Sequence, residues 1–274
     1  MPEIPDLEVI KDFLNERLAG QEVVRAEAPK SWIVRSLAAE HFEQDVIGRR
    51  FGTITRLGKD LVFPLDPDRL LVANLMLTGR FQYTEPSHRV SRGMFFLLGT
   101  KDADLRYSDS RSMGRIHYVR PDQLGQIQRL QDQGPDALDG GVSYEGFKER
   151  LRSYTGEIKG VLARGKLLAG IGNAYVDEIL WEARVSPFRK RKTLTDEELR
   201  QVYDAITKVL REAIEVVRRE MPPNIHIKVR DFLSVHRKGG EPCPRCGTTI
   251  SEITPNQRIT SWCRTCQPGG LIKN

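Results

Sequence analysis

The chain has 274 residues and carries 43 lysines and arginines against 37 aspartates and glutamates, a formal net charge of +6. This length favours two domains and a small module over one compact domain, and the modest basic excess would suit an acidic partner such as nucleic acid. The first residues include Glu3, Asp6 and Glu8, and no apolar run approaches the roughly 18 to 20 residues that span a bilayer. These features argue against a secretory signal and a membrane anchor, so we expect a soluble cytoplasmic protein.

Two kinds of sequence pattern follow each other in the first 120 residues. Apolar side chains recur at three- and four-residue steps from Ile4 to Leu18, and Gly20 follows, which predicts an amphipathic helix. From about residue 21 onward, short β-rich runs are separated by Gly, Pro and Asp, and this spacing predicts a mainly antiparallel sandwich or barrel. The predicted strands are Val23 to Ala26, Arg50 to Leu57, Leu61 to Leu65, Leu70 to Leu75, Met94 to Leu98 and Leu105 to Tyr107.

The pattern changes again beyond residue 133. A stretch rich in Gly, Pro and Asp, from Gly134 to Gly141, predicts a linker, and the runs after it are long enough for helices. Thr195 with Glu198 three residues later has the pattern of a capping box at the start of the longest run. The predicted helices cover Tyr144 to Tyr154, Gly160 to Ala163, Tyr175 to Ala183 and Thr195 to Glu220, so we expect the second domain to be helical.

The four cysteines lie near the C-terminal end, in two Cys-x2-Cys pairs separated by 16 residues. That spacing predicts one tetrahedral zinc site formed by Cys243, Cys246, Cys263 and Cys266. Four thiolates leave no open position for water, so we expect the zinc to be structural. Paired thiols of this kind also favour a reducing compartment over a disulfide framework.

Pro2 is a candidate nucleophile. Once the initiator Met1 is removed, its secondary amine becomes the free N-terminus and can attack a carbonyl-like carbon without any side chain. The neighbouring Glu3 offers a carboxylate that can carry protons. A proline and an acid at the start of a helix are also ordinary helix-initiating residues, and that alternative needs no catalysis.

A further motif, Gly170-Ile-Gly172-Asn173, precedes a predicted helix. Such a turn can present backbone amides to a phosphate, although a plain turn between helices has the same pattern. Five motifs occur in order along the chain: Met1 to Glu8, Gly58-Lys59, Asp109 to Gly114, Gly170 to Tyr175, and Gln257 to Thr260 between the cysteine pairs. Together they resemble the formamidopyrimidine-DNA glycosylase and endonuclease VIII family over essentially the whole chain.

The resemblance implies an α+β fold in three parts. An N-terminal helix and an antiparallel β-sandwich would form a catalytic domain over residues 1–132, followed by a helix-two-turn-helix DNA-binding domain over 133–235 and a zinc finger over 236–274. It implies a monomeric base-excision repair enzyme, associated with the nucleoid, that removes 8-oxoguanine and formamidopyrimidines from duplex DNA through a Pro2 Schiff base. The same enzyme would nick the abasic site by β,δ-elimination, with one structural Zn²⁺ and no organic cofactor.

The resemblance also assigns roles to individual residues. Pro2 would be the nucleophile, Glu3 the general acid and base, and Lys59 a cation near the reacting sugar. Other residues would hold phosphates or fill the void that the extruded base leaves in the duplex. The phosphate contacts would come from Asn173, Arg258 and Asn74, and the void would be filled by Leu77, Arg111 and Met113.

Several positions depart from the pattern usual in formamidopyrimidine-DNA glycosylases. Asn74 stands where a histidine is usual, Ser112 and Met113 where arginine and phenylalanine are usual, and Asp6 where a glutamate is common. The preferred lesion therefore stays open, with an endonuclease VIII-like preference for oxidised pyrimidines as one alternative. A catalytically silent damage-binding protein on the same scaffold is a second, and a zinc-ribbon protein that binds RNA or protein is a third. Neither of these two binding proteins would need Pro2 or Glu3.

Overall fold

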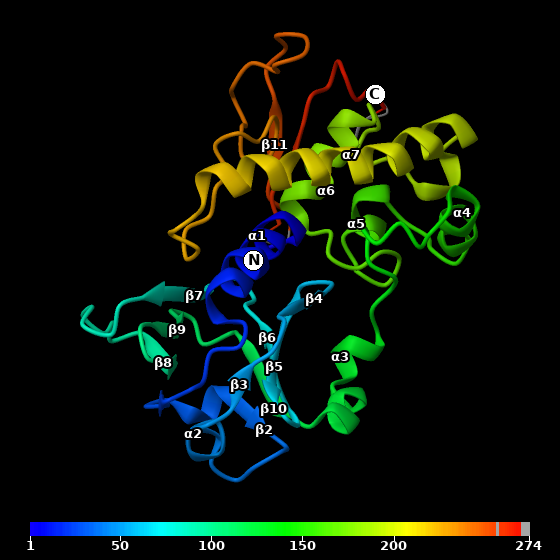
Figure 1. Cartoon of the computed structure of the whole chain (residues 1–274). Coiled ribbons are helices and arrows are strands. Elements are labelled where there is room, and N and C mark those ends of the chain that lie inside the picture. Colours follow the sequence, from blue (N-terminus) through cyan, green and yellow to red (C-terminus); the bar gives the residue numbers. More distant parts are fainter. Residues whose placement is uncertain (256–257, 270–274) are drawn as a thin grey trace. The chain divides into compact units, whose positions relative to one another are not determined.

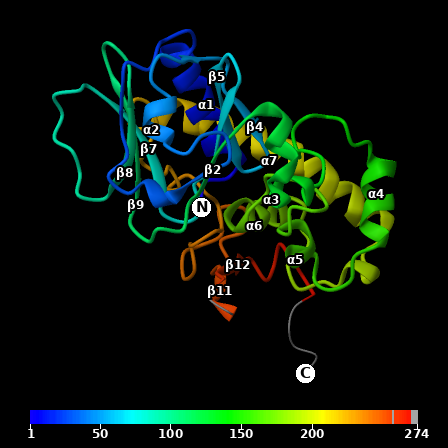
Figure 2. The same ribbon diagram turned by 90° about the horizontal axis from the view of Figure 1, so that it is seen from below.

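The computed structural model describes residues 1–255 and 258–269, and the chain divides into two compact units. The β-sandwich unit contains Met1–Asp132 together with Val217–Val229, and the helical unit contains Gln133–Val216 and the described residues from Arg230 onward. Figures 1 and 2 show the long strands in the first unit and a group of helices in the second. The predicted α+β class is confirmed.

Two sheets form the β-sandwich unit. The four-stranded sheet has the order β1-β8-β9-β7, and the six-stranded sheet has the order β2-β10-β6-β5-β3, with β4 paired to β5. Within residues 1–132 every pairing is antiparallel except that of β10 with β2. The strands are β1 (Arg25–Glu27), β2 (Val34–Ser36), β3 (Arg50–Phe51), β4 (Thr55–Leu57), β5 (Asp60–Asp66), β6 (Arg69–Asn74), β7 (Gly79–Thr84), β8 (Met94–Gly99), β9 (Asp104–Asp109) and β10 (Arg115–Val119).

The predicted strand from Arg50 to Leu57 is divided in the structure. It forms β3 and β4, and Gly52 lies between them with its amide bonded to the Pro64 carbonyl at 2.9 Å. A side chain at Gly52 would come within 2.9 Å of Pro64 Cβ, so the close approach of these two segments requires glycine. Three strands, β2, β7 and β10, were not predicted. The parallel strand β2 has three residues, too few to show an alternating pattern.

Aromatic rings fill the space between the two sheets. Phe63 of β5 lies 5.2 Å from Phe81 of β7, and Tyr107 of β9 lies 5.4 Å from Phe81 and 5.2 Å from Phe96 of β8, measured between ring centroids. All four side chains are completely buried. Because such rings bury large apolar areas, this cluster is a main contribution to the stability of the sandwich.

Helices pack against the strands of the sandwich unit, and α1 lies against β4 and β5. The helix α1 (Ile4–Leu18) buries Leu7, Ile10 and Leu14, as its periodicity predicted. The outer face of the six-stranded sheet carries a second apolar cluster that includes Val62, Val72, Val119 and Ile127. The shorter helices of the unit are η1 (Ser31–Ile33), α2 (Phe42–Asp45), η2 (Pro121–Gln126) and α3 (Gln128–Gln131).

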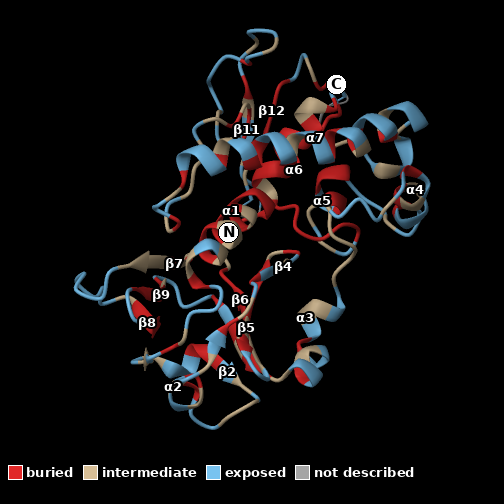
Figure 3. Ribbon diagram, in the orientation of Figure 1, coloured by how far each residue is buried: buried red, intermediate tan, exposed pale blue. Residues whose placement is uncertain are grey.

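The helical unit is built on α4 (Tyr144–Arg152), α5 (Ile158–Leu162), α6 (Asn173–Glu182), η3 (Arg191–Thr193) and α7 (Asp196–Glu220). The predicted capping box is present, because the Glu198 amide donates to the Thr195 hydroxyl at 3.2 Å and the Glu198 carboxylate accepts from the Thr195 amide at 2.9 Å. Figure 3 shows α6 buried along most of its length. Near the cysteines, β11 (Ser251–Ile253) and β12 (Thr260–Trp262) form a hairpin. Within the part of the chain that the structure describes, no helix has the length and apolar character to cross a membrane.

Candidate functional site

Pro2 and Glu3 lie immediately before α1, and both are buried. The Glu3 amide donates to Asp6 Oδ2 at 2.8 Å, which ties the candidate acid to the first turn of the helix. Burial, followed by the positive charge of Lys228, lowers the pKa of the Met1 amino group to about 5. An amine in this environment is uncharged at neutral pH, and the uncharged form is the nucleophile.

Lys228 was not identified from the sequence as a functional residue. In the structure it belongs to the β-sandwich unit, where its ammonium affects the N-terminal amine and donates to the Leu77 carbonyl at 3.4 Å. Leu77 is one of the predicted void-filling residues. A single lysine in an irregular segment carries no sequence signal of its own, so only its position in the fold reveals this contact.

Lys59 lies at the tip of the hairpin between β4 and β5, next to Gly58, whose φ is 58°. Arg56 pairs with Glu8 of α1 and donates to the Gly58 carbonyl at 2.8 Å. The hairpin that carries Lys59 is therefore attached to the helix that follows Pro2 and Glu3.

Asn74 is 4% exposed, and both ends of its amide bond backbone atoms. Its Nδ2 donates to the Lys59 carbonyl at 3.1 Å, and its Oδ1 accepts from the Met76 amide at 3.2 Å. These bonds shape the Lys59 hairpin and the start of the loop that follows β6. Direct contact of Asn74 with a phosphate stays a prediction.

The three predicted void-filling side chains lie on two loops of the β-sandwich unit. Leu77 belongs to the 75–78 loop between β6 and β7, and Arg111 and Met113 belong to the 110–114 loop between β9 and β10. Leu77 is 44% exposed and Met113 37%, although both are large apolar residues. Exposed apolar side chains on adjacent loops are suited to insertion between bases.

In the helical unit the structure brings Asn173 and the Arg258 segment together. Asn173 is the first residue of α6, and its Nδ2 donates to the Ile259 carbonyl at 2.8 Å. Arg258 itself is exposed. The predicted phosphate-binding pair thus shares one anchoring point, although 84 residues separate the two in sequence. Gln257, which belongs to the same motif, lies outside the described residues.

A buried charge cluster supports that segment. Lys159 Nζ lies 2.7 Å from Asp177 Oδ1 and also donates to the Ile259 carbonyl at 2.7 Å and the Thr260 hydroxyl at 2.8 Å. The other oxygen of Asp177 lies 2.7 Å from His236 Nδ1. His236 is therefore engaged with a carboxylate of this cluster. The sequence did not identify Lys159, because nothing in Ile158-Lys159-Gly160 distinguishes it from a solvated lysine.

The four cysteines form the one group of possible metal ligands found among the described residues, and their sulfur atoms lie within 4.8 Å of one another. Cys243 Sγ is 3.9 Å from Cys266 Sγ, and Cys246 Sγ is 3.4 Å from Cys263 Sγ. Bonds of about 2.3 Å to a tetrahedral zinc place sulfurs roughly 3.8 Å apart. The donor set and its spacing therefore fit one zinc ion, as predicted.

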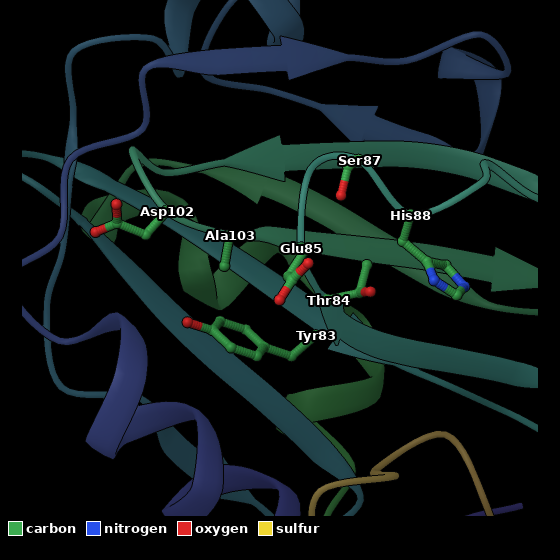
Figure 4. A pocket seen from close by; sticks show the side chains of 7 residues that line it. All are labelled: Tyr83, Thr84, Glu85, Ser87, His88, Asp102 and Ala103. Atoms are coloured by element: carbon green, nitrogen blue, oxygen red, sulfur yellow. The ribbon is translucent and has the colours of Figure 1, made fainter.

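A surface pocket of about 440 Å³ lies elsewhere on the β-sandwich unit, at the end of β7 (Figure 4). None of the predicted site residues lines it. Its walls include the carboxylates of Glu85 and Asp102, which would repel a phosphate backbone. The pocket therefore does not belong to the candidate site.

Comparison with known proteins identifies relatives over the whole chain. The N-terminal domain of formamidopyrimidine-DNA glycosylase matches residues 1–116, its H2TH domain matches 133–221, and a zinc finger found in FPG and IleRS matches 240–269. The chain is 32% identical to the formamidopyrimidine-DNA glycosylase of Pelotomaculum thermopropionicum, over 97% of this chain and 99% of the relative. Its identity to the enzyme of Lactococcus lactis subsp. lactis is 30%, over the same shares.

Solved structures give the same result. The structure of Lactococcus lactis Fpg with DNA containing an abasic site superposes with a TM-score of 0.89 at 29% identity, covering 97% of this chain and 100% of that chain. MutM in complex with DNA containing carbocyclic 8-oxo-G gives a TM-score of 0.88 at 29% identity, over 98% and 100%. The chain therefore belongs to the formamidopyrimidine-DNA glycosylase family.

Proposed function

We propose that this protein is a DNA glycosylase and abasic-site lyase that excises oxidised purines from duplex DNA. The observation that carries the proposal is the buried pair Pro2 and Glu3 at the start of α1, next to the Met1 amino group, whose pKa burial lowers to about 5. A protein that only bound damaged DNA would need neither residue. The named relatives, and their complexes with Fapy-dG and 8-oxo-G, favour oxidised purines over oxidised pyrimidines.

The chemistry begins with the Pro2 amine, which becomes free when Met1 is removed. Its nitrogen attacks C1′ of the damaged nucleotide, the bond between C1′ and the base breaks, and the base leaves with a proton. The C1′–O4′ bond of the sugar ring then breaks as O4′ takes a proton, which leaves an open-chain iminium between C1′ and the Pro2 nitrogen. This iminium acidifies the adjacent sugar protons, so the phosphates leave in turn by β- and δ-elimination. Glu3 moves the protons that these steps require, first at the ring oxygen of the sugar.

The remaining predicted residues bind and distort the DNA. Lys59 supplies a cation near the sugar, and Asn173 with Arg258 binds phosphates through amide and guanidinium donors. Leu77, Arg111 and Met113 fill the void left by the extruded base. In this assignment residues 1–132 form the catalytic domain, 133–235 bind DNA, and 236–274 form the zinc finger. The enzyme acts as a monomer on the DNA of the nucleoid.

The test is covalent trapping by borohydride with Met1 removed. Duplexes containing 8-oxoguanine, a formamidopyrimidine, thymine glycol or an abasic site are incubated with the wild type, with Pro2→Gly and with Pro5→Gly. We expect a trapped complex with the wild type, formed faster on the oxidised purines, and little with Pro2→Gly. Pro5→Gly is the matched control, because it removes a proline from the same helix start and leaves the amine in place. Tight binding of the wild type without any trapped complex would identify a silent binder instead.

A further inference from the structure

The 75–78 loop and the 110–114 loop begin and end on paired strands. Asn74 at the end of β6 pairs with Arg115 at the start of β10, and Gly79 at the start of β7 pairs with Asp109 at the end of β9. β6 and β10 belong to the six-stranded sheet, and β7 and β9 to the four-stranded sheet. Both loops therefore cross from one sheet to the other at the same end of the sandwich, side by side.

The carboxylate of Asp109 lies at the junction of the two loops and is 3% exposed. Its Oδ1 accepts from the hydroxyl of Thr78 in the first loop and from the Arg111 amide at 3.1 Å in the second. Its Oδ2 accepts from the Gly114 amide at 2.7 Å and the Tyr107 hydroxyl at 3.3 Å. One buried side chain thus joins both void-filling loops to the sheet.

These bonds require the ionised form of Asp109. Burial alone would raise its pKa, but the bonds from Thr78 and from the amides of Gly114, Arg111 and Met113 hold the pKa of this carboxyl below its ordinary value. A carboxylate that accepts several amide donors at once has no equivalent among neutral side chains. An asparagine of the same size would turn one N–H group toward donors that need an acceptor.

Each loop contains one residue other than glycine whose backbone has a positive φ, a conformation that such residues rarely adopt. Met76 in the first loop has φ 48°, and Ser112 in the second has φ 53°. Such conformations persist where the surrounding structure imposes them, and they concentrate at functional sites. Packing is equally tight at the ends of the loops, because a side chain at Gly114 would come within 1.8 Å of the Tyr107 hydroxyl oxygen.

We infer that Asp109 is a positioning residue for base extrusion, which fixes the two loops relative to each other so that Leu77 and Met113 enter the duplex together. This inference rests on the proposed function, since it concerns the void that the extruded base leaves. Asp109 does not touch the reacting sugar in this account. It acts through the loops, so its loss affects substrates that demand extrusion more than substrates that do not.

The experiment compares two substrates in single-turnover reactions. The first is duplex DNA with 8-oxoguanine, which requires extrusion, and the second is a single-stranded oligonucleotide with an abasic site, which has no base to extrude. We expect Asp109→Asn to slow excision from the duplex about tenfold to a hundredfold, in line with a lost hydrogen bond to a charged group. Trapping on the single strand should stay within about twofold of the wild type.

Thr78 supplies the matched pair of variants. Thr78→Val keeps the volume and removes the hydroxyl, so it should weaken duplex excision in the same direction as Asp109→Asn. Thr78→Ser restores the hydroxyl and should recover the wild-type rate. Equal losses on both substrates, or full duplex excision by Asp109→Asn, would overturn the inference.

A readout without catalysis separates this inference from the proposed function. A 2-aminopurine is placed next to a tetrahydrofuran analogue of the abasic site, which has no C1′ hydroxyl or base to lose and is not cleaved, and its fluorescence in duplex DNA changes when side chains fill the void. We expect that change with the wild type and a reduced change with Asp109→Asn at saturating protein. If the wild type cleaves neither substrate, the proposed function fails, while this fluorescence difference still decides the role of Asp109. Equal signals from the two proteins would refute it.

Discussion

Replacing Lys159 by methionine tests whether the buried charge cluster holds the Arg258 segment in place. The ammonium of Lys159 lies 2.7 Å from Asp177 Oδ1, and the side chains are 11% and 0% exposed respectively. The same ammonium holds the Ile259 carbonyl and the Thr260 hydroxyl. Methionine keeps the apolar stem of the side chain and removes the charge with all these bonds.

The expected loss of stability follows from what remains around Asp177. Breaking a buried ion pair costs about 3–5 kcal/mol, because the partner is left charged and without its counterion. His236 Nδ1 and the Ser261 amide still contact the other oxygen of Asp177, at 2.7 and 3.3 Å. We therefore expect the lower end of that range, about 3 kcal/mol, which is a large share of a typical total of about 5–15 kcal/mol.

The assay is urea unfolding of the full zinc-loaded chain, followed by tryptophan fluorescence. Trp181 and Trp262 both lie in the helical unit and report on it. Lys208→Met is the control, because Lys208 also forms an ion pair in this unit, with Glu182, but its side chain is 54% exposed. Such a pair contributes under about 1 kcal/mol. If Lys159→Met loses no more stability than Lys208→Met, the cluster does not stabilise the unit as argued.

DNA affinity should fall in Lys159→Met alone, since Ile259 adjoins Arg258.

Two further predictions concern the zinc ligands and a half-buried histidine. Cys246→Ala should lose the bound zinc and weaken DNA binding, and a folded variant with unchanged metal content and affinity would contradict a structural zinc. Burial, then the charges of Arg129, Arg35 and Arg115, lower the pKa of His117 to about 4, from an ordinary value near 6.5. The unfolded chain therefore binds more protons between these values, so stability falls as pH is lowered from about 6.5 to about 4. His117→Gln should show a shallower loss in acid unfolding, and an unchanged pH dependence would refute this assignment.

The sequence predicted the four longest helices of the fold but only part of the strands. The periodicity of residues 4–18 and the capping box at Thr195 were confirmed, because each depends on neighbours within a few residues. The strands β2, β7 and β10 were missed. The three residues of β2 are defined by pairing with β10, some 80 residues later in the chain. The division of the predicted strand at Gly52 depends on contact with Pro64, which is also a tertiary effect.

The candidate site shows a similar limit. Motifs identified the zinc ligands, whose spacing reflects a requirement of the metal itself. The chemistry of a free N-terminal proline indicated Pro2, and family resemblance supplied further candidates, among them Lys59 and Arg258. Neither route identified Lys159 or Lys228, and Asp109 was noted only as part of a motif. The contacts of these three residues are with backbone atoms and side chains brought close by folding, and a single sequence does not display such contacts.

Buried side chains hold the backbone at or next to three residues predicted to touch DNA. Asn74 bonds the Lys59 carbonyl, Asp109 bonds the amide of Arg111, and Lys159 bonds the carbonyl next to Arg258. Asn74, Asp109 and Lys159 are each under about 10% exposed as whole residues. Each bonds a backbone atom, so it fixes the position of the main chain and leaves the side chain of the DNA-contacting residue free to meet the substrate. A backbone anchor of this kind tolerates changes in the exposed side chain itself. The departures at Ser112 and Met113 fall on such a loop, and their effect should be on the choice of lesion while the position of the loop is preserved.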